Sequence, residues 1–458
     1  MRLSALKTKH FIYLSLFTLF SYSFSGINDN KETNQNEKGT LQFRFDFGNG
    51  NLQLGYTKVT GDMVYDKKRG FGFVSEDSVI SIDRKGKNAL TSDFCTSNKP
   101  FYFVLDIPEG NYEVKITFGD RKGISRTTVK AESRRLMLED VKTAKGKFIT
   151  KTITINIRTP KINSEENIHL KSRELAYLNW DDKLTLEFNN ERPCINAVEI
   201  KEIKDIITVF LAGNSTVVDQ EYEPWYSWGQ MITRFFNEKV AIANFAESGE
   251  ALKSFQSSGR LKKILSLMKP GDYLFIKFGH NDQKPQSSTY VKAFTGYQEE
   301  LKKFIRAARN LGGNPVLINS TQRRNFDENG KIINTHGDYP EAVRQTAKEE
   351  NVHFIDLTGM SKDLYEALGI EGSKKAFVYY PANSFPGQDK ELADNSHFNP
   401  YGAYQLAKCI IKGIRENNLE LANYLIDAEP YNPSKPDSFE AWNLPSSPSF
   451  QSIKPDRY

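Results

Sequence analysis

The hydrophobic and polar residues follow two different patterns on either side of residue 205. Before it, short runs alternate hydrophobic and polar residues with a period of two, and glycine, asparagine and aspartate separate the runs. This pattern is typical of antiparallel strands with one face in a core, and no helix of useful length is indicated. We therefore predict an all-β sandwich for residues 40–204. Its clearest strands are expected at residues 41–47, 101–107, 111–118 and 183–188.

After residue 205, continuous apolar runs alternate with amphipathic segments. A continuous run indicates a strand buried on both faces, and strands that alternate with helices form a mostly parallel sheet covered on both sides. We therefore predict an α/β domain for residues 205–429. The runs that predict its strands are 206–211, 240–244, 273–278, 315–318 and 352–357.

Two helices of the α/β region can be placed from the sequence. Residues 297–311 carry apolar side chains at helical spacing, and Gly312 follows as a C-cap. In the last helix, Asn399 occupies the N-cap position and Pro400 the first turn. His353 lies inside the fifth apolar run, so we expect its side chain in the core.

The first 39 residues differ from the rest of the chain. Residues 1–25 combine a basic start with an apolar run from Phe11 to Phe20, and small residues precede Gly26. These features predict a signal peptide that directs export to the periplasm or the medium, with a retained N-terminal anchor as the alternative. Residues 26–39 are polar, and we interpret them as a tether.

The last segment, residues 430–458, is rich in proline but also holds large apolar side chains. These are Phe439, Trp442, Leu444 and Phe450. A disordered tail usually lacks such residues. We therefore expect an extended strap that packs on the folded body.

Composition and charge limit the classes of partner. Hydrophobic residues make up 38% of the 458 and charged residues 26%, as in soluble globular proteins. The net charge is +5, and three of the positive charges lie within the first 25 residues, so neither nucleic acid nor a stable membrane association is indicated. The oligomeric state stays open. Of the three cysteines, no pair has metal-site spacing; Cys95 and Cys194 form either a disulfide or two buried thiols, and the third is Cys409.

Four short polar motifs stand where a parallel sheet would place a ligand site. Gly213–Ser215, Ala246–Gly249 and Gly279–Asp282 each follow a predicted strand, and Asp394–His397 precedes the last helix. Ligand sites of open parallel sheets lie at the carboxyl ends of the strands. We therefore expect the four motifs to meet at one edge of the sheet.

The residue types in these motifs suit acyl transfer through a serine. The hydroxyl of Ser215 becomes a nucleophile when a base takes its proton; His397 can be that base, and Asp394 can orient it. Backbone N–H groups of Ser215 and Gly249 and the side-chain amide of Asn281 can bind the oxyanion. This chemistry needs no cofactor and no metal. The structural alternatives are a helix N-cap for Ser215, a structural histidine at position 397 and a plain loop residue at position 281.

These motifs resemble the SGNH, or GDSL-like, hydrolases, whose Ser, Gly, Asn and His correspond to Ser215, Gly249, Asn281 and His397. The resemblance implies a three-layer αβα, flavodoxin-like domain. It also implies a serine esterase with the catalytic triad Ser215, Asp394 and His397.

The detailed sequences of Gly213–Val217, Trp225–Met231, Phe278–Asp282 and Asp394–His397 are similar to the rhamnogalacturonan acetylesterase branch of that family. This resemblance covers about residues 206–428 and implies a secreted carbohydrate esterase that removes O-acetyl groups from pectic polysaccharide. A deacetylase for another glycan, such as xylan, and a non-catalytic glycan-binding protein are the alternatives. Asn214 departs from the family motif, which has Asp there, but this position is outside the triad. The Gly-x-Ser-x-Gly elbow of the other large esterase fold is absent.

Four further residues are candidates for substrate binding: His280, Arg323, Arg324 and His336. The two arginines directly follow a predicted strand end, and a guanidinium fork suits the carboxylate of a uronic acid. A loop braced by salt bridges is the alternative for the arginines. A purely structural role is equally open for His280.

The sandwich resembles galactose-binding-like modules, chiefly through Phe47–Gly50 and its strand pattern. Since a fold does not determine a function, glycan binding and a structural role both stay open for it. Trp225 and Trp228 leave a similar choice between stacking on a sugar and packing in the core, and we expect the core.

Overall fold

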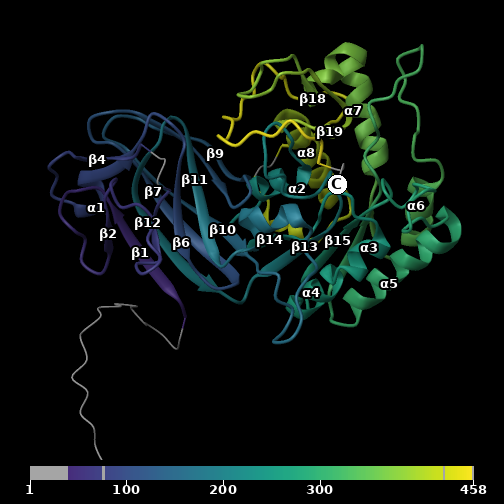
Figure 1. Cartoon of the computed structure of the whole chain (residues 1–458), viewed down its shortest axis with the longest axis horizontal. Coiled ribbons are helices and arrows are strands. Elements are labelled where there is room, and N and C mark those ends of the chain that lie inside the picture. The colour runs from purple at the N-terminus through teal and green to yellow at the C-terminus, as the bar shows by residue number, and fades with distance from the viewer. Residues whose placement is uncertain (1–39, 75–77, 427–428, 456–458) are drawn as a thin grey trace, which may run out of the picture. The chain divides into compact units, whose positions relative to one another are not determined.

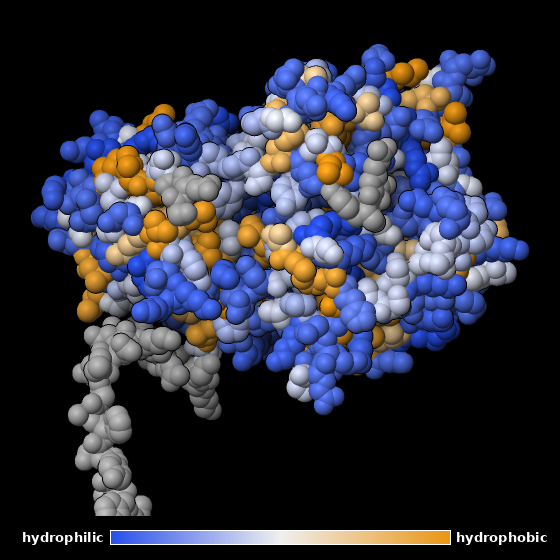
Figure 2. Space-filling model, in the orientation of Figure 1, coloured by the Kyte–Doolittle hydropathy of each residue, from blue (hydrophilic) through white to orange (hydrophobic). Residues whose placement is uncertain are grey.

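The computed structural model describes residues 40–74, 78–426 and 429–455 (Figure 1). The expected signal peptide, residues 1–25, and the tether, residues 26–39, lie outside the described residues. Within the described ranges, no helix combines the length and the apolar character needed to cross a membrane. On the face drawn in Figure 2, hydrophobic residues form small groups among hydrophilic ones, as is usual for a globular protein.

The N-terminal part is the predicted β-sandwich, and it has two sheets. In spatial order, the first sheet consists of β10 (Phe148–Ile157), β7 (Gly110–Gly119), β12 (Cys194–Ile203), β1 (Gln42–Phe47) and β2 (Thr57–Val59), with β5 (Asp93–Thr96) on β12 and β4 (Ile80–Asp83) on β5. The second consists of β3 (Phe71–Phe73), β6 (Phe101–Asp106), β11 (Lys183–Arg192), β8 (Ser125–Ala131) and β9 (Arg135–Thr143). Helical turns are short here, as expected: α1 (Ala89–Ser92), η1 (Ser172–Ala176) and η2 (Leu178–Trp180).

Phenylalanine side chains fill the space between the two sheets. Phe45 and Phe47 both lie in the core because alternate residues of β1 face the same side. The ring of Phe103 on β6 lies 5.2 Å from the ring of Phe45 and 5.1 Å from that of Phe47, measured between centroids. Burying each such side chain contributes about 1.5–3 kcal/mol, so this cluster holds the sheets together.

The cysteines are buried free thiols. Cys95 on β5 stands opposite Ile195, and Cys194 on β12 stands opposite Thr96, so the two cysteines are diagonal neighbours on paired strands. Of the two alternatives left open by the sequence, the structure has the thiols.

The C-terminal part is the predicted αβα domain. Its parallel sheet has the order β14 (Val240–Asn244), β13 (Ile207–Gly213), β15 (Tyr273–Lys277), β16 (Asn314–Ile318) and β17 (His353–Ile355). One face packs on α3 (Leu252–Ser257), α4 (Arg260–Leu267), α5 (Gln298–Arg309) and α6 (Tyr339–Glu349) (Figure 1). The other packs on α2 (Trp228–Met231), η3 (Ile232–Phe235), α7 (Leu357–Gly372) and α8 (Pro400–Glu416).

Both helices predicted in this domain are present. Helix α5 follows the π-helical turn η4 (Ala293–Tyr297), and Gly312 beyond it adopts a φ of +74°, which favours glycine. At the start of α8, Asn399 caps the helix because its side-chain oxygen accepts a hydrogen bond from the Gly402 N–H at 3.0 Å. The shorter elements η5 (Ser373–Ala376) and η6 (Glu420–Tyr424) complete the domain.

The C-terminal segment packs on the folded body along the residues that the structure describes. Tyr431 and Leu444 are buried, and the indole N–H of Trp442 donates to Glu139 of β9 at 2.7 Å. The backbones of Phe450 and Glu223 form an isolated parallel β-bridge. The segment is therefore a strap that touches both the sandwich and the α/β domain.

Candidate active site

The four polar motifs meet at the carboxyl edge of the parallel sheet. Ser215 lies two residues beyond β13 and is 6% exposed. Asp394 and His397 lie on β19 (Leu392–Phe398), which forms an antiparallel hairpin with β18 (Phe377–Tyr380). The sequence placed these two residues before α8, as observed, but did not indicate a strand.

The side chains of Ser215, His397 and Asp394 form a hydrogen-bonded chain. His397 Nε2 lies 2.8 Å from Ser215 Oγ, and His397 Nδ1 lies 2.8 Å from Asp394 Oδ2. Asp394 Oδ1 also accepts hydrogen bonds from the backbone N–H groups of Ser396 and His397. This arrangement lets the imidazole take a proton from the serine while the carboxylate holds the ring in place.

The local charges keep Asp394 ionised. Burial alone would raise the pKa of Asp394, but the charge and hydrogen bond of His397 outweigh it and hold that pKa well below its usual range. Lys454 of the strap adds to this effect, since its Nζ lies 3.5 Å from Asp394 Oδ1. No local pattern predicts this contact, because the two residues are far apart in the chain.

Two of the three residues expected to bind an oxyanion, Gly249 and Asn281, lie on the loops that follow β14 and β15. Gly249 is exposed and has a φ of +84°, so it can present its backbone N–H in a tight turn that favours glycine. Asn281 Nδ2 already donates to the Glu250 carbonyl at 3.0 Å, which orients the amide. Asp282 joins the two loops because it accepts from the backbone N–H groups of Leu252 and Gly279, both at 2.8 Å.

A segment outside the α/β domain supports the Gly249 loop. Lys171 donates to the Ser248 carbonyl and forms an ion pair of 2.8 Å with Glu250. Arg173 donates to the same carbonyl at 2.8 Å and forms an ion pair with Glu247. Sequence reasoning missed both residues, which belong to the connection between β10 and β11.

His280 and His336 form a buried pair next to Asn281. Their rings meet edge to face with centroids 4.5 Å apart, and Lys277 Nζ lies 2.9 Å from His280 Nδ1. Burial and the nearby cations hold the pKa of both histidines well below the ordinary value, so both rings are neutral. Among the described residues, His280 Nε2 and both ring nitrogens of His336 have no hydrogen-bond partner.

The two arginines have different surroundings. Arg323 is half-buried and donates to Thr335 at 2.9 Å, close to His336. Arg324 is buried and donates to Ser373 Oγ at 3.0 Å and Asn395 Oδ1 at 3.2 Å. The Arg324 side chain therefore ties β19, which carries Asp394, to Ser373.

The remaining candidates lie as follows. Trp225 and Trp228 are buried, as expected, at 3% and 0% exposure. The expectation for His353 was wrong, since this residue is exposed on β17. Strand β17 is an edge strand of three residues, so its faces are less covered than those of the central strands.

In the part of the chain that the structure describes, no group of three or more His, Cys, Asp or Glu residues is arranged to hold a metal ion.

Two family models match the chain. Residues 210–403 match the GDSL-like lipase/acylhydrolase family. Residues 43–158 match a galactose-binding domain-like model described for β-agarase and YXIM esterase-like proteins. The two matches fall on the two parts that the fold separates.

Curated relatives match the chain over different lengths. The rhamnogalacturonan acetylesterase RhgT of Bacillus subtilis (strain 168) is 43% identical over 229 residues, which are 50% of this chain and 97% of the relative. The probable rhamnogalacturonan acetylesterase YesY of the same organism is 36% identical over 48% of this chain and 97% of the relative. The uncharacterized esterase YxiM, also from that organism, is 25% identical over 82% of this chain and 91% of the relative.

Proposed function

The chain belongs to the GDSL-like lipase/acylhydrolase family of carboxylic-ester hydrolases, and we propose that it is an acetylesterase that acts on a polysaccharide. The observation that carries this proposal is the hydrogen-bonded chain from Asp394 through His397 to Ser215. A serine paired with an imidazole and a buried carboxylate is the arrangement that activates a hydroxyl for acyl transfer.

The proposed reaction proceeds through an acetyl-enzyme. Ser215 Oγ attacks the acetyl carbonyl carbon while His397 Nε2 takes the hydroxyl proton, and the carbonyl electrons move onto the oxygen. The N–H groups of Ser215 and Gly249 and the Asn281 amide bind this oxyanion; one such donor is worth about 2.7–4 kcal/mol in other serine hydrolases. The bond to the sugar oxygen then breaks, and that oxygen takes the proton from His397.

Water completes the cycle. His397 removes a proton from a water molecule, which attacks the acetyl carbonyl, and the same oxyanion donors act again. Acetate leaves, and Ser215 regains its proton from His397. Asp394 stays ionised throughout and orients the imidazole.

For the substrate we propose O-acetylated pectic polysaccharide of the rhamnogalacturonan type. The support is the relatives RhgT and YesY, which carry that activity in their names and match the chain over 97% of their own length. Arg323 also supports a uronic acid, because its guanidinium lies in the same cluster as the candidate oxyanion donor Asn281. The guanidinium donates to Thr335, which precedes His336, and the His336 ring packs against His280, the neighbour of Asn281. We further propose that residues 1–25 direct export, so that the enzyme meets the polysaccharide outside the cytoplasm.

A panel of acetylated polysaccharides tests the proposal. We expect the wild-type protein to release acetate from acetylated rhamnogalacturonan faster than from acetylated xylan, with Ser215→Ala as the inactive control. Preference for xylan would contradict the pectic substrate. Acetate release from no glycan, together with hydrolysis of p-nitrophenyl acetate, would contradict polysaccharide deacetylation but not the esterase chemistry.

A further inference from the structure

A cavity lies where the sandwich, the loop after Ser215 and the strap come together. Its volume is about 660 Å³, within the usual range of about 300–1,000 Å³ for small-molecule sites. The lining includes Tyr102, Val104, Glu132, Leu178, Glu221 and Ser449. None of these residues belongs to the triad or the oxyanion site.

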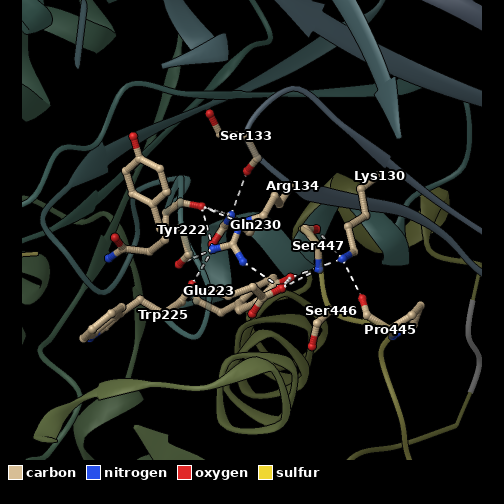
Figure 3. Close-up of polar contacts among 12 residues, drawn as sticks. Lys130, Ser133, Arg134, Tyr222, Glu223, Trp225, Gln230, Pro445, Ser446 and Ser447 are labelled. Atoms are coloured by element: carbon tan, nitrogen blue, oxygen red, sulfur yellow. Dashed lines mark hydrogen bonds and ion pairs between the residues drawn. The ribbon is translucent and has the colours of Figure 1, made fainter. Parts of the chain in front are cut away.

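Buried contacts of Arg134 hold two walls of this cavity in place (Figure 3). Arg134 lies in the turn between β8 and β9, and its guanidinium donates to the backbone carbonyls of Gln220 at 2.9 Å and of Tyr222 and Trp225 at 2.7 Å. It also forms an ion pair of 3.0 Å with Glu223. The loop that follows the nucleophile is therefore fixed to the sandwich.

Lys130 holds the third wall, which is the strap (Figure 3). Its Nζ donates to the Pro445 carbonyl and to Ser447 Oγ, both at 2.7 Å. The Ser447 hydroxyl donates in turn to Glu187 at 2.7 Å. Because buried groups fix all three walls, the cavity exists before any ligand arrives.

The lining combines an apolar surface with a few polar groups. Tyr102, Val104 and Leu178 supply the apolar part, and Glu132 and Glu221 supply carboxyl groups. The lining also holds two cations: Arg134 is neutralised by its ion pair with Glu223, and Lys99 is exposed to solvent. Burial raises the pKa of Glu132 to about 8 and that of Glu221 to about 7, so neither carboxyl carries a full charge at neutral pH. An uncharged ring with one apolar face and several hydroxyl groups matches this lining.

The cavity is close to the proposed catalytic serine. Gln220, whose carbonyl is bound by Arg134, donates through its Nε2 to the Ser215 carbonyl at 2.7 Å. The strap links the two places, because Ser449 lines the cavity and Lys454 pairs with Asp394. The Cα atoms of these two strap residues are at most about 18 Å apart, and the Lys454 side chain covers the remaining distance to Asp394. A short oligosaccharide can therefore occupy the cavity and the active site together.

We propose that this cavity is a binding subsite for an uncharged saccharide unit of the same polysaccharide whose acetyl ester is cleaved at Ser215. The inference rests on the proposed function, and it adds a role for the sandwich and the strap. RhgT and YesY match about half of this chain over nearly all of their own length, so the other half of this chain has no counterpart in them. The subsite would let this chain hold a longer stretch of polymer.

The test blocks the cavity from its exposed rim. Ser449→Trp places an indole in the opening, and Ser446→Trp does the same from the other end of the strap wall; both serines are exposed, and the contacts that the structure gives them run through their backbone. Ser434→Trp is the matched control, since Ser434 is an exposed strap serine outside the lining. For each protein, kcat/KM is measured on acetylated rhamnogalacturonan and on p-nitrophenyl acetate.

We expect both rim variants to lower the ratio of polymer to small-ester kcat/KM by about tenfold or more, corresponding to a loss of about 1.4 kcal/mol of binding. Ser434→Trp should keep the wild-type ratio. If wild type releases acetate from the polymer and the rim variants keep the wild-type ratio, the subsite is refuted and the proposed function stands. If wild type releases no acetate from any glycan, the proposed function fails, and the subsite with it.

Discussion

Replacing Arg134 by methionine should destabilise the protein strongly, because one buried guanidinium joins the sandwich to the loop after Ser215. Arg134 is 4% exposed and its partner Glu223 is 2% exposed. The variant removes the donor of three backbone carbonyls and the charge that faces Glu223. Glu223 would keep the Tyr226 hydroxyl at 2.9 Å and the Ser447 N–H at 2.8 Å, but it would lose its cation.

Removing one partner of a buried ion pair costs about 3–5 kcal/mol, whereas a surface pair is worth about 0–1 kcal/mol. Equilibrium urea unfolding measures this difference as a change in the free energy of unfolding. We expect a loss of about 3–5 kcal/mol for Arg134→Met. The matched control is Arg344→Met, because Arg344 is half-exposed and pairs with Glu341 and Asp356, both at 3.1 Å, on the surface; its loss should stay below about 1 kcal/mol.

A second variant separates the charge from the packing. In Arg134→Met/Glu223→Gln the uncompensated carboxylate is gone, so part of the lost stability should return. The reasoning is refuted if Arg134→Met loses no more than Arg344→Met. It is also refuted if the double variant is less stable than Arg134→Met alone.

Three further predictions concern pH, the strap and the substrate. Burial raises the pKa of Glu132 to about 8 from about 4.3 in an unfolded chain, so folding binds a proton between these two pH values and the free energy of unfolding falls as pH rises. The Glu132→Gln variant lacks this titration, so from pH 5 to 8 it should gain stability relative to wild type by up to about 1.4 kcal/mol per pH unit. A pH-independent difference between the two proteins would contradict this. Residues 430–455 should resist limited proteolysis, whereas rapid trimming without a lower Tm would show that the strap is not needed. Arg323→Gln should raise KM for acetylated pectin about tenfold to a hundredfold with a much smaller effect on p-nitrophenyl acetate, because a hydrogen bond to a charged group is worth about 1.5–3 kcal/mol; equal effects on both substrates would make Arg323 structural.

Much of the α/β domain follows from local sequence. Strands β13 to β16 are continuous apolar runs because both faces of each strand are buried, and that pattern is visible in single segments. The placement of Ser215, Gly249 and Asn281 on loops at the carboxyl edge of the sheet also follows, since the carboxyl ends of parallel strands share one edge of a sheet.

The features that the sequence did not predict depend on contacts between distant segments. Lys171 and Arg173 support the Gly249 loop from the sandwich side, and Lys454 reaches Asp394 from the strap. Neither the periodicity of the sequence nor the spacing of its motifs predicts such pairs. The contacts of Arg324 could not be predicted for the same reason. Its position in the sequence fits a substrate contact equally well, and only the structure shows that it donates to Ser373 and Asn395.

The hairpin that carries Asp394 and His397 was missed for a related reason. Strand β19 reads Leu-Ala-Asp-Asn-Ser-His-Phe, in which polar residues predominate, because this two-stranded hairpin contributes side chains to the site. For strand β17 the sequence predicted more burial than the structure has. The apolar neighbours of His353 suggested a core position, but β17 lies at the edge of the sheet and leaves this residue exposed.

The central claim is that Ser215 is the nucleophile, and one labelling measurement tests it most directly. The native protein is treated with a serine-directed organophosphate, digested and examined by mass spectrometry, with Ser215→Ala as the parallel sample. The account predicts a single adduct on the peptide that contains Ser215, esterase activity that falls in step with labelling, and neither adduct nor activity in a folded Ser215→Ala protein. An adduct on another serine, or wild-type activity in the alanine variant, would contradict it.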